Sequence, residues 1–92
     1  MKAIGRMPRP HDHVIFTDLN GLEGVLVDLN TRQYFQINES ACLIWRGLVK
    51  GTSVADIARE LTERYDVTLH HAQSSVETAV ARFRAHRLVD SA

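Results

Sequence analysis

The chain has 92 residues, of which 45% are hydrophobic and 24% are charged. This composition is close to that of an average globular protein, so it argues against the disordered, collagen-like and coiled-coil classes. A chain of this length folds as one small domain of modest stability, and it is too short for a two-lobed enzyme with a cleft between its lobes.

Charge and cysteine content narrow the function classes further. Eleven Lys and Arg residues balance eleven Asp and Glu residues, so no overall cationic field would attract nucleic acid or anionic lipid. The single cysteine, Cys42, excludes an intrachain disulfide framework and a four-cysteine zinc site, and it favours a reducing compartment. No stretch approaches the roughly 18 apolar residues of a membrane span. We therefore expect a cytoplasmic protein.

The first part of the chain divides into a tail and three strands. Residues 1–12 contain two prolines and no hydrophobic period, which predicts a flexible N-terminal tail, with a single domain over residues 13–90. Residues 13–18 alternate in polarity, residues 24–29 are apolar on both faces, and residues 33–37 are rich in aromatic and β-branched types. Because Asn20-Gly21 and Asn30-Thr31-Arg32 break these runs, we expect a three-stranded antiparallel meander.

From residue 38 onward the hydrophobic period becomes helical. Asn38 is a good N-cap for a first helix that Gly51 ends, and Ser53 with Asp56 has capping-box spacing for a second helix reaching Tyr65. A third amphipathic stripe follows, formed by Ala72, Val76, Ala79, Val80 and Phe83. Three strands followed by three helices predict an α+β domain with a helix-turn-helix-like core.

The residues that most often carry chemistry have the wrong spacing for it. His70 and His71 are adjacent, so on a helix they point about 100° apart, whereas helical zinc pairs need i, i+4 spacing. His11 and His13 flank Asp12 in the tail without a further ligand, and Cys42 is expected to be a small buried thiol. No phosphate loop, nucleophile elbow or paired-carboxylate motif is present. We therefore expect no enzymatic activity, no metal and no cofactor.

The third predicted strand has an unusual edge. Residues 33–37 contain no Lys, Pro, Gly or acidic residue, so the usual devices against pairing with a stray strand are missing. One interpretation is that the third helix covers this edge, or that Arg32 is enough to protect it. The other is that the edge stays open for an incoming peptide strand.

The ordered set of residues resembles the PqqD-like proteins, which are the peptide-recognition elements (RREs) of ribosomally made, post-translationally modified peptide (RiPP) pathways. The resemblance spans about residues 13–90 and is carried by the run from Gly24 to Asn38, then Ala41, Ile44-Trp45, Leu48, Gly51-Thr-Ser53, Ile57, Leu61, Tyr65-Asp-Val67, Val76 and Leu88-Val89. Each of these positions taken alone reflects only hydrophobic patterning, but the order of the whole set is fairly specific to this family.

Within that superfamily the segment Asp28 to Phe35 looks most like the free-standing members of lasso-peptide gene clusters. Arg32 and Arg87 depart from the pattern, because many relatives have glycine at both positions. Glycine there often serves a positive φ, so we expect the turn and the helix end to be built differently, with Asn30 as a candidate for the left-handed residue.

The resemblance implies a winged-helix-like fold and a non-catalytic role in leader-peptide binding. It implies that the precursor's leader adds as a strand beside residues 33–37, in a groove walled by the third helix. The monomeric protein would then deliver the leader to a separate cysteine-protease-type leader peptidase, while an ATP-dependent, asparagine-synthetase-like cyclase acts on the released core peptide. In the quinone-cofactor pathway the partner would instead be a radical enzyme.

Such a groove must be apolar, because ladder hydrogen bonds alone do not offset the entropy lost by the leader. We expect Phe35 and the third helix to provide its wall, with Ala79 as the entry point for a leader ring and Arg82, Arg84 and Arg87 as partners for acidic leader residues. The predicted peptide-binding residues are Gln33, Tyr34, Phe35, Gln36, Ser75, Val76, Ala79, Val80, Arg82 and Phe83.

Two other readings stay open at this point. The helix-turn-helix core and the arginines of the third helix also fit a winged-helix nucleic-acid-binding protein, although Glu77 and the neutral net charge oppose it. The second alternative is that the chain is a small subunit that only assembles with an enzyme.

Overall fold

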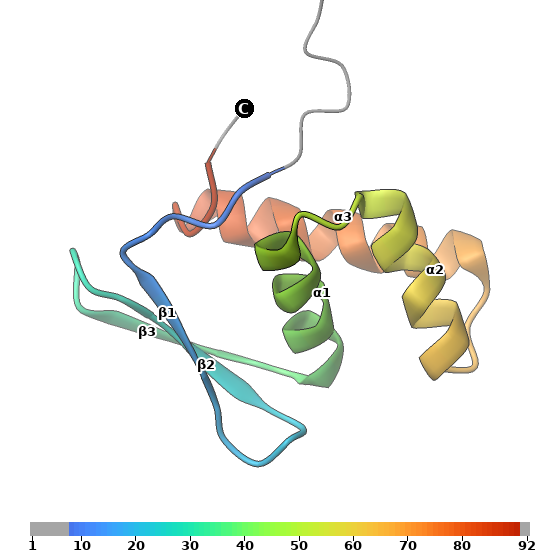
Figure 1. Cartoon of the computed structure of the whole chain (residues 1–92), viewed down its shortest axis with the longest axis horizontal. Coiled ribbons are helices and arrows are strands. Elements are labelled where there is room, and N and C mark those ends of the chain that lie inside the picture. Colours follow the sequence, from blue (N-terminus) through green and yellow to red (C-terminus); the bar gives the residue numbers. More distant parts are fainter. Residues whose placement is uncertain (1–7, 91–92) are drawn as a thin grey trace, which may run out of the picture.

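The computed structural model describes residues 8–90 and confirms the predicted α+β class. Three strands come first, followed by three helices (Figure 1). The elements are β1 (Val14–Asp18), β2 (Gly24–Asp28), β3 (Gln33–Ile37), α1 (Glu39–Lys50), α2 (Val54–Arg64) and α3 (Leu69–Ala85). The sheet is antiparallel in the order β1-β2-β3, so β3 lies at one of its edges.

Only one face of the sheet is covered by helices. Val14, Leu26 and Ile37 point to the helices and are buried, because alternate residues of a strand point to opposite faces. The opposite face, which we call the outer face, is formed by Ile15, Thr17, Val25, Val27, Tyr34 and Gln36. None of these six residues is buried, and none is charged.

Helix α1 lies at the centre of the core, between the sheet and the other two helices (Figure 1). Trp45 is buried, and its ring meets the Phe83 ring of α3 edge-to-face at 5.2 Å between centroids. Gly47 allows α2 to approach closely, because a Cβ atom there would lie 2.7 Å from Cγ1 of Ile57. Helix α1 therefore sets the positions of both α2 and α3.

Each helix begins at a side-chain cap. The side chains of Asn38 and Ser53 accept hydrogen bonds from Ala41 N at 3.0 Å and Asp56 N at 3.1 Å, as their spacing predicted. Thr68 caps α3 by accepting from His71 N at 3.1 Å, a cap that the helical period alone did not indicate.

Part of the predicted tail is paired with the domain. The N-terminal arm (residues 8–12) runs antiparallel to the segment after α3, through a bridge between Pro10 and Val89. His11 N donates to Leu88 O at 3.1 Å, and Asp90 N donates to Arg9 O at 2.9 Å. The packed domain thus extends beyond the expected boundary at residue 13. Residues 1–7 lie outside the described residues, so the flexibility expected of them stays a prediction.

The turn between β2 and β3 is built on Asp28, whose carboxylate is buried beneath it. Its Oδ1 atom accepts from Asn30 N at 2.9 Å and Thr31 N at 3.2 Å, and Nε2 of His13 lies 3.7 Å away. Burial acts to raise the pKa of Asp28, but these backbone donors and His13 together hold it below its ordinary value. The expectation for Asn30 was wrong, because Arg32 itself is left-handed, with φ of 61°.

The end of α3 is also closed by an arginine in the left-handed conformation. Arg87 has a φ of 59°, and Leu88 N reaches back to Phe83 O at 2.8 Å. This six-to-one bond defines a Schellman motif, in which the left-handed position is usually glycine. The chain therefore closes α3 with a Schellman motif that carries a non-glycine side chain at the left-handed position.

We predict that Arg87→Gly stabilises the domain, because a left-handed conformation costs a non-glycine residue about 1 kcal/mol or more. Urea denaturation should show a gain of about 1 kcal/mol. The control Ala85→Gly, in the last turn of α3, should lower stability by about the same amount. A loss of stability in Arg87→Gly would mean that its side chain contributes more than its backbone strain costs.

Candidate peptide-binding site

The outer edge of β3 presents backbone groups that no strand within residues 8–90 pairs. Leu29 N donates to His13 O at 2.9 Å, and Leu19 N donates to Glu23 O at 2.9 Å, which fixes the odd residues of β2 as the partners of β1. The even residues of β2 then bond to β3, because hydrogen bonding alternates along an antiparallel strand. The N–H and C=O groups of Tyr34 and Gln36 therefore point away from the sheet.

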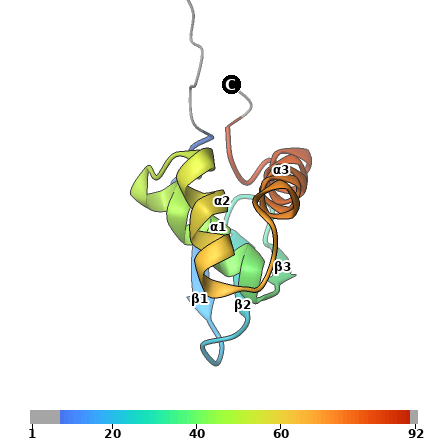
Figure 2. The same ribbon diagram turned by 90° about the vertical axis from the view of Figure 1, so that its right-hand side faces the viewer.

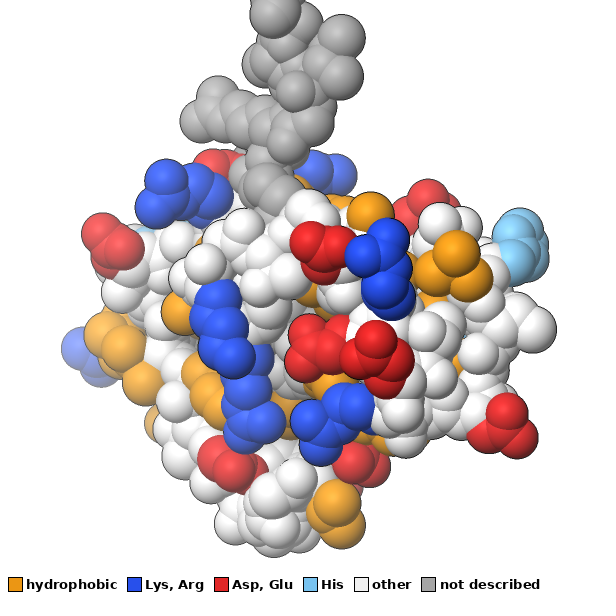
Figure 3. Space-filling view, turned by 45° about the vertical axis from the view of Figure 1, so that its right-hand side comes forward, with side chains coloured by type: hydrophobic (Ala, Val, Ile, Leu, Met, Phe, Trp, Pro, Cys, Tyr) orange, Lys and Arg blue, Asp and Glu red, His pale blue; other side chains and the backbone are white. Residues whose placement is uncertain are grey.

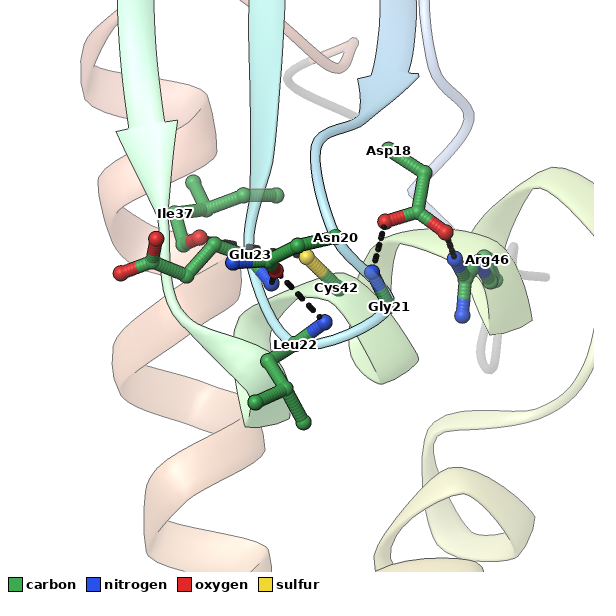
Figure 4. A network of polar contacts seen from close by, with 8 residues as sticks. All are labelled: Asp18, Asn20, Gly21, Leu22, Glu23, Ile37, Cys42 and Arg46. Carbon is green, nitrogen blue, oxygen red and sulfur yellow. Dashed lines mark hydrogen bonds and ion pairs between the residues drawn. The ribbon is translucent and has the colours of Figure 1, made fainter.

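The two edges of the sheet differ in their protection. At the β1 edge, Nη2 of Arg46 pairs with Oδ2 of Asp18 at 3.2 Å (Figure 4). The Arg46 guanidinium also lies 5.2 Å from the centre of the Phe16 ring. At the β3 edge all five residues are uncharged, and Tyr34 is 74% exposed. Such a pair of charges protects β1 against edge pairing, whereas β3 has no comparable device.

Helix α3 runs on the β3 side of the molecule without closing this edge (Figure 2). The two elements meet where the rings of Phe35 and His86 approach to 4.7 Å between centroids. Over residues 8–90, no backbone hydrogen bond joins the N-terminal arm to the outer edge of β3. Tyr34 and Gln36 are both exposed, so the third helix does not cover the edge at these two residues.

A groove lies between α3 and the start of α1, next to the end of β3. Its near part, the near groove, has a volume of about 360 Å³. On one side it is lined by Asn38, Ser40, Ala41 and Ile44, and on the other by His71, Ser74, Ser75, Thr78, Ala79 and Arg82. A strand added beside β3 would direct alternate side chains toward it.

The predicted site residues fall into two groups. The edge residues and the groove residues lie where a peptide could reach them: Gln33, Tyr34, Phe35, Gln36, Ser75, Ala79 and Arg82. Val76, Val80 and Phe83 are instead core residues, with 0%, 6% and 4% of their surface exposed. The hydrophobic stripe of α3 faces α1 and α2, so the groove is lined by the neighbouring stripe of smaller and more polar residues. Contact of any of these residues with a peptide stays a prediction.

Sequence reasoning missed the wall contributed by α1. Asn38, Ser40 and Ala41 were interpreted as the start of a helix, and Asn38 is indeed its cap. The sequence did contain a signal for the α3 wall of the groove. Residues 71, 75, 78 and 82 lie on one face of the helix, because positions i, i+4, i+7 and i+11 share a face. The facing wall could not be found without knowing how α1 packs.

The ionisable groups around the groove are few. Burial raises the pKa of Tyr65, and the nearby Glu39 carboxylate raises it further. Burial also raises the pKa of the Cys42 thiol, which is buried as expected, so it is poorly suited to act as a nucleophile.

The histidines do not gather into a metal site in the part of the chain that the structure describes. His70 and His71 are exposed at the start of α3, and His11 stacks on His13 with 5.1 Å between centroids. Within residues 8–90, the helices are all too short or too polar to cross a membrane.

Comparisons with known proteins agree with this geometry. No curated protein sequence matches significantly. The fold is similar to that of TbiB1 in complex with the TbiA(beta) leader peptide, with a TM-score of 0.84 at 20% identity over 91% of this chain and 96% of that one. It is also similar to lasso peptide synthetase B1 complexed with its leader peptide, with a TM-score of 0.83 at 26% identity over 91% and 98%.

The family comparison covers most of the domain. Residues 23–89 match the family of coenzyme PQQ synthesis protein D (PqqD). The matched range runs from the start of β2 to the segment after α3, and so contains the open β3 edge and both walls of the groove. By this match and by its fold, the chain belongs to the PqqD family.

Proposed function

We propose that this chain binds the leader segment of a ribosomally made precursor peptide as a fourth strand beside β3. The observation that carries this proposal is the uncharged and unpaired edge of β3 next to the near groove. Further support comes from the two similar structures, both of which are complexes with leader peptides. Because one of them is a lasso peptide synthetase, we infer that the precursor is a lasso peptide.

The energetics of strand addition require the groove. Ordering about six leader residues costs roughly 1–2 kcal/mol each, while four to six ladder hydrogen bonds return only about 0.5–1.5 kcal/mol each. A dissociation constant of about 1 µM needs about −8 kcal/mol. The binding free energy must therefore come mainly from buried leader side chains, each of which contributes about 1.5–3 kcal/mol when fully buried. Ala41 and Ala79 line the groove, are partly exposed, and offer apolar surface for them.

In this proposal the protein is a carrier without catalytic activity of its own. It presents the leader to a separate cysteine-protease-type leader peptidase, and an ATP-dependent cyclase of the asparagine-synthetase type acts on the released core peptide. The alternative pathway is that of the quinone cofactor, in which the family resemblance would place a radical enzyme as partner.

The outer face of the sheet is where we place that partner enzyme. Ile15, Val27 and Tyr34 lie directly opposite one another on the three strands, in an uncharged row. Ile15 is 44% exposed and Tyr34 is 74% exposed, so this row is open to solvent. Interface centres are depleted in charge and enriched in tyrosine. A leader strand beside β3 would extend this face, so an enzyme docked here would contact both proteins at once.

Nucleic-acid binding is disfavoured by the distribution of charge. The chain has no net charge, and on the face in Figure 3 basic side chains lie directly beside acidic ones. Phosphate binding needs several cations without nearby acids and is lost steeply as salt rises. Strand addition depends on burial and ladder bonds, so leader binding should change little between low and moderate salt.

We predict that Ala79→Trp, which fills the near groove, weakens leader binding by about tenfold or more because each anchor side chain contributes at least about 1.4 kcal/mol. The probe is a fluorescein-labelled synthetic leader of a lasso-peptide precursor that the wild-type protein binds, and the readout is fluorescence polarisation. Ala81→Trp is the matched control, because Ala81 is exposed on the other side of α3. Equal affinities for the two variants would exclude this groove.

We predict that Val27→Lys uncouples the partner enzyme from a loaded carrier. A lysine in the uncharged row places an unpaired charge in the proposed interface, which should slow leader cleavage by the partner peptidase about tenfold or more. The leader's dissociation constant should stay within about twofold, since Val27 does not line the groove. The control Leu22→Lys changes an exposed leucine in the β1–β2 turn. Unchanged cleavage by Val27→Lys would move the docking site elsewhere.

A further inference from the structure

Three titratable side chains in a row join the N-terminal arm to the β2–β3 turn. The ring of His11 stacks on the ring of His13, with 5.1 Å between centroids and 12° between the ring planes. Nε2 of His13 in turn lies 3.7 Å from Oδ1 of Asp28. All three residues line a cavity of about 470 Å³, which shares no lining residue with the near groove. This cluster is therefore separate from the candidate peptide-binding site.

Asp28 supplies a fixed negative charge at the inner end of the cluster. Its side chain is 4% exposed, whereas that of His13 is 31% exposed. Burial acts to raise the pKa of Asp28, but the backbone amides of the turn and the charge of His13 hold it below its ordinary value. Asp28 is therefore a carboxylate throughout the range of about pH 5–8 in which histidines change charge, and it attracts a protonated ring at His13.

A second proton on the stacked rings is opposed by charge. Two imidazolium rings at this separation repel each other, and Asp28 can compensate only the ring that it faces. His86 and Arg87 at the end of α3 line the same cavity and bring further positive charge to it. The remaining charged residues of the elements that meet here are Arg9 and Asp12 on the arm, Arg32 in the β2–β3 turn, Arg82 and Arg84 in the last turn of α3, and Asp90 after it. Cations outnumber acids in this set, so the surroundings do not favour a second imidazolium.

The N-terminal arm is held less firmly than the strand that follows it. The C=O group of His13 accepts from Leu29 N at 2.9 Å, and β1 begins at the next residue. The arm, in contrast, is joined to the segment after α3 by one β-bridge, with two backbone hydrogen bonds of 3.1 and 2.9 Å. A third bond runs from Arg9 N to the Asp90 carboxylate at 3.2 Å. Repulsion between the two rings is therefore relieved at the lowest cost by movement of the arm.

We propose that the N-terminal arm is a pH-dependent strap, which stays docked while His11 and His13 share one proton and is released when both rings are protonated. A released arm binds more protons than a docked one, because its His11 ring has left the charged His13 ring, so docking weakens as the pH falls. The arm also forms one wall of a cavity of about 850 Å³ that reaches Trp45 and Leu48 in the core. Release opens this side of the core to water.

The test is amide hydrogen exchange, measured by NMR on the full chain at pH 7.5 and pH 5.5. The reporters are the N–H groups of His11 and Asp90, which donate across the bridge between the arm and the segment after α3. After correction for the intrinsic rate at each pH, exchange at both should be about tenfold or more faster at pH 5.5, with little change at Leu26 in the central strand. Equal protection at the two pH values would overturn the proposal, because the rings would then part by side-chain rotation alone.

His11→Phe assigns the effect to the second proton, because phenylalanine keeps a ring for the stack and cannot be protonated. Its arm should stay docked at both pH values, as judged by exchange at Asp90. His70→Phe is the matched control, since His70 is exposed at the start of α3, and it should respond to pH as wild type does. If the arm of His11→Phe is released at pH 5.5 as in wild type, another group controls the arm and the assignment is wrong.

Trp45 provides an independent readout, because it is the one tryptophan of the chain and lines the cavity beneath the arm. Quenching of its fluorescence by acrylamide should increase from pH 7.5 to pH 5.5 in wild type and stay constant in His11→Phe. Unchanged quenching in wild type, or an equal increase in both proteins, would contradict the opening of the core by release of the arm.

Discussion

The contact between Trp45 and Phe83 is the constraint on which the binding surface depends. It fixes α3 to α1, at 5.2 Å between ring centroids, rather than to the sheet. Val76 and Val80 extend the same buried stripe of α3. The hydrophobic face of α3 packs against α1 and α2, so α3 lies beside β3 without pairing to it. The strand therefore keeps a free edge, with the groove next to it.

The same arrangement explains why the two edges of one small sheet behave differently. Next to β1, the exposed side of α1 brings Arg46 to Asp18, so a stray strand would have to displace an ion pair and a cation–π contact. Next to β3, the groove offers serine, alanine and threonine side chains from α3. A three-stranded sheet therefore directs strand addition to one side, by charge at one edge and open space at the other.

The sequence predicted the elements well because each has a local cause. The strand and helix periods, the caps at Asn38 and Ser53, and the uncharged third strand are all readable from neighbouring residues, and the structure confirms them. The lining of the groove was less predictable, because Val76, Val80 and Phe83 belong to a hydrophobic stripe whose partner only the packing reveals. The turn was misjudged for a similar reason: buried Asp28 holds the amides of Asn30 and Thr31, which leaves Arg32 as the left-handed residue.

The most direct test is hydrogen exchange, measured by NMR, at the amides of Tyr34 and Gln36 as the cognate leader peptide is titrated. These two N–H groups point away from the sheet in the free protein, whereas Phe35 and Ile37 bond to β2. Strand addition predicts that exchange at Tyr34 and Gln36 slows by about tenfold or more on saturation, with little change at Phe35 and Ile37. If the leader binds while both amides exchange as fast as before, the peptide does not add to this sheet.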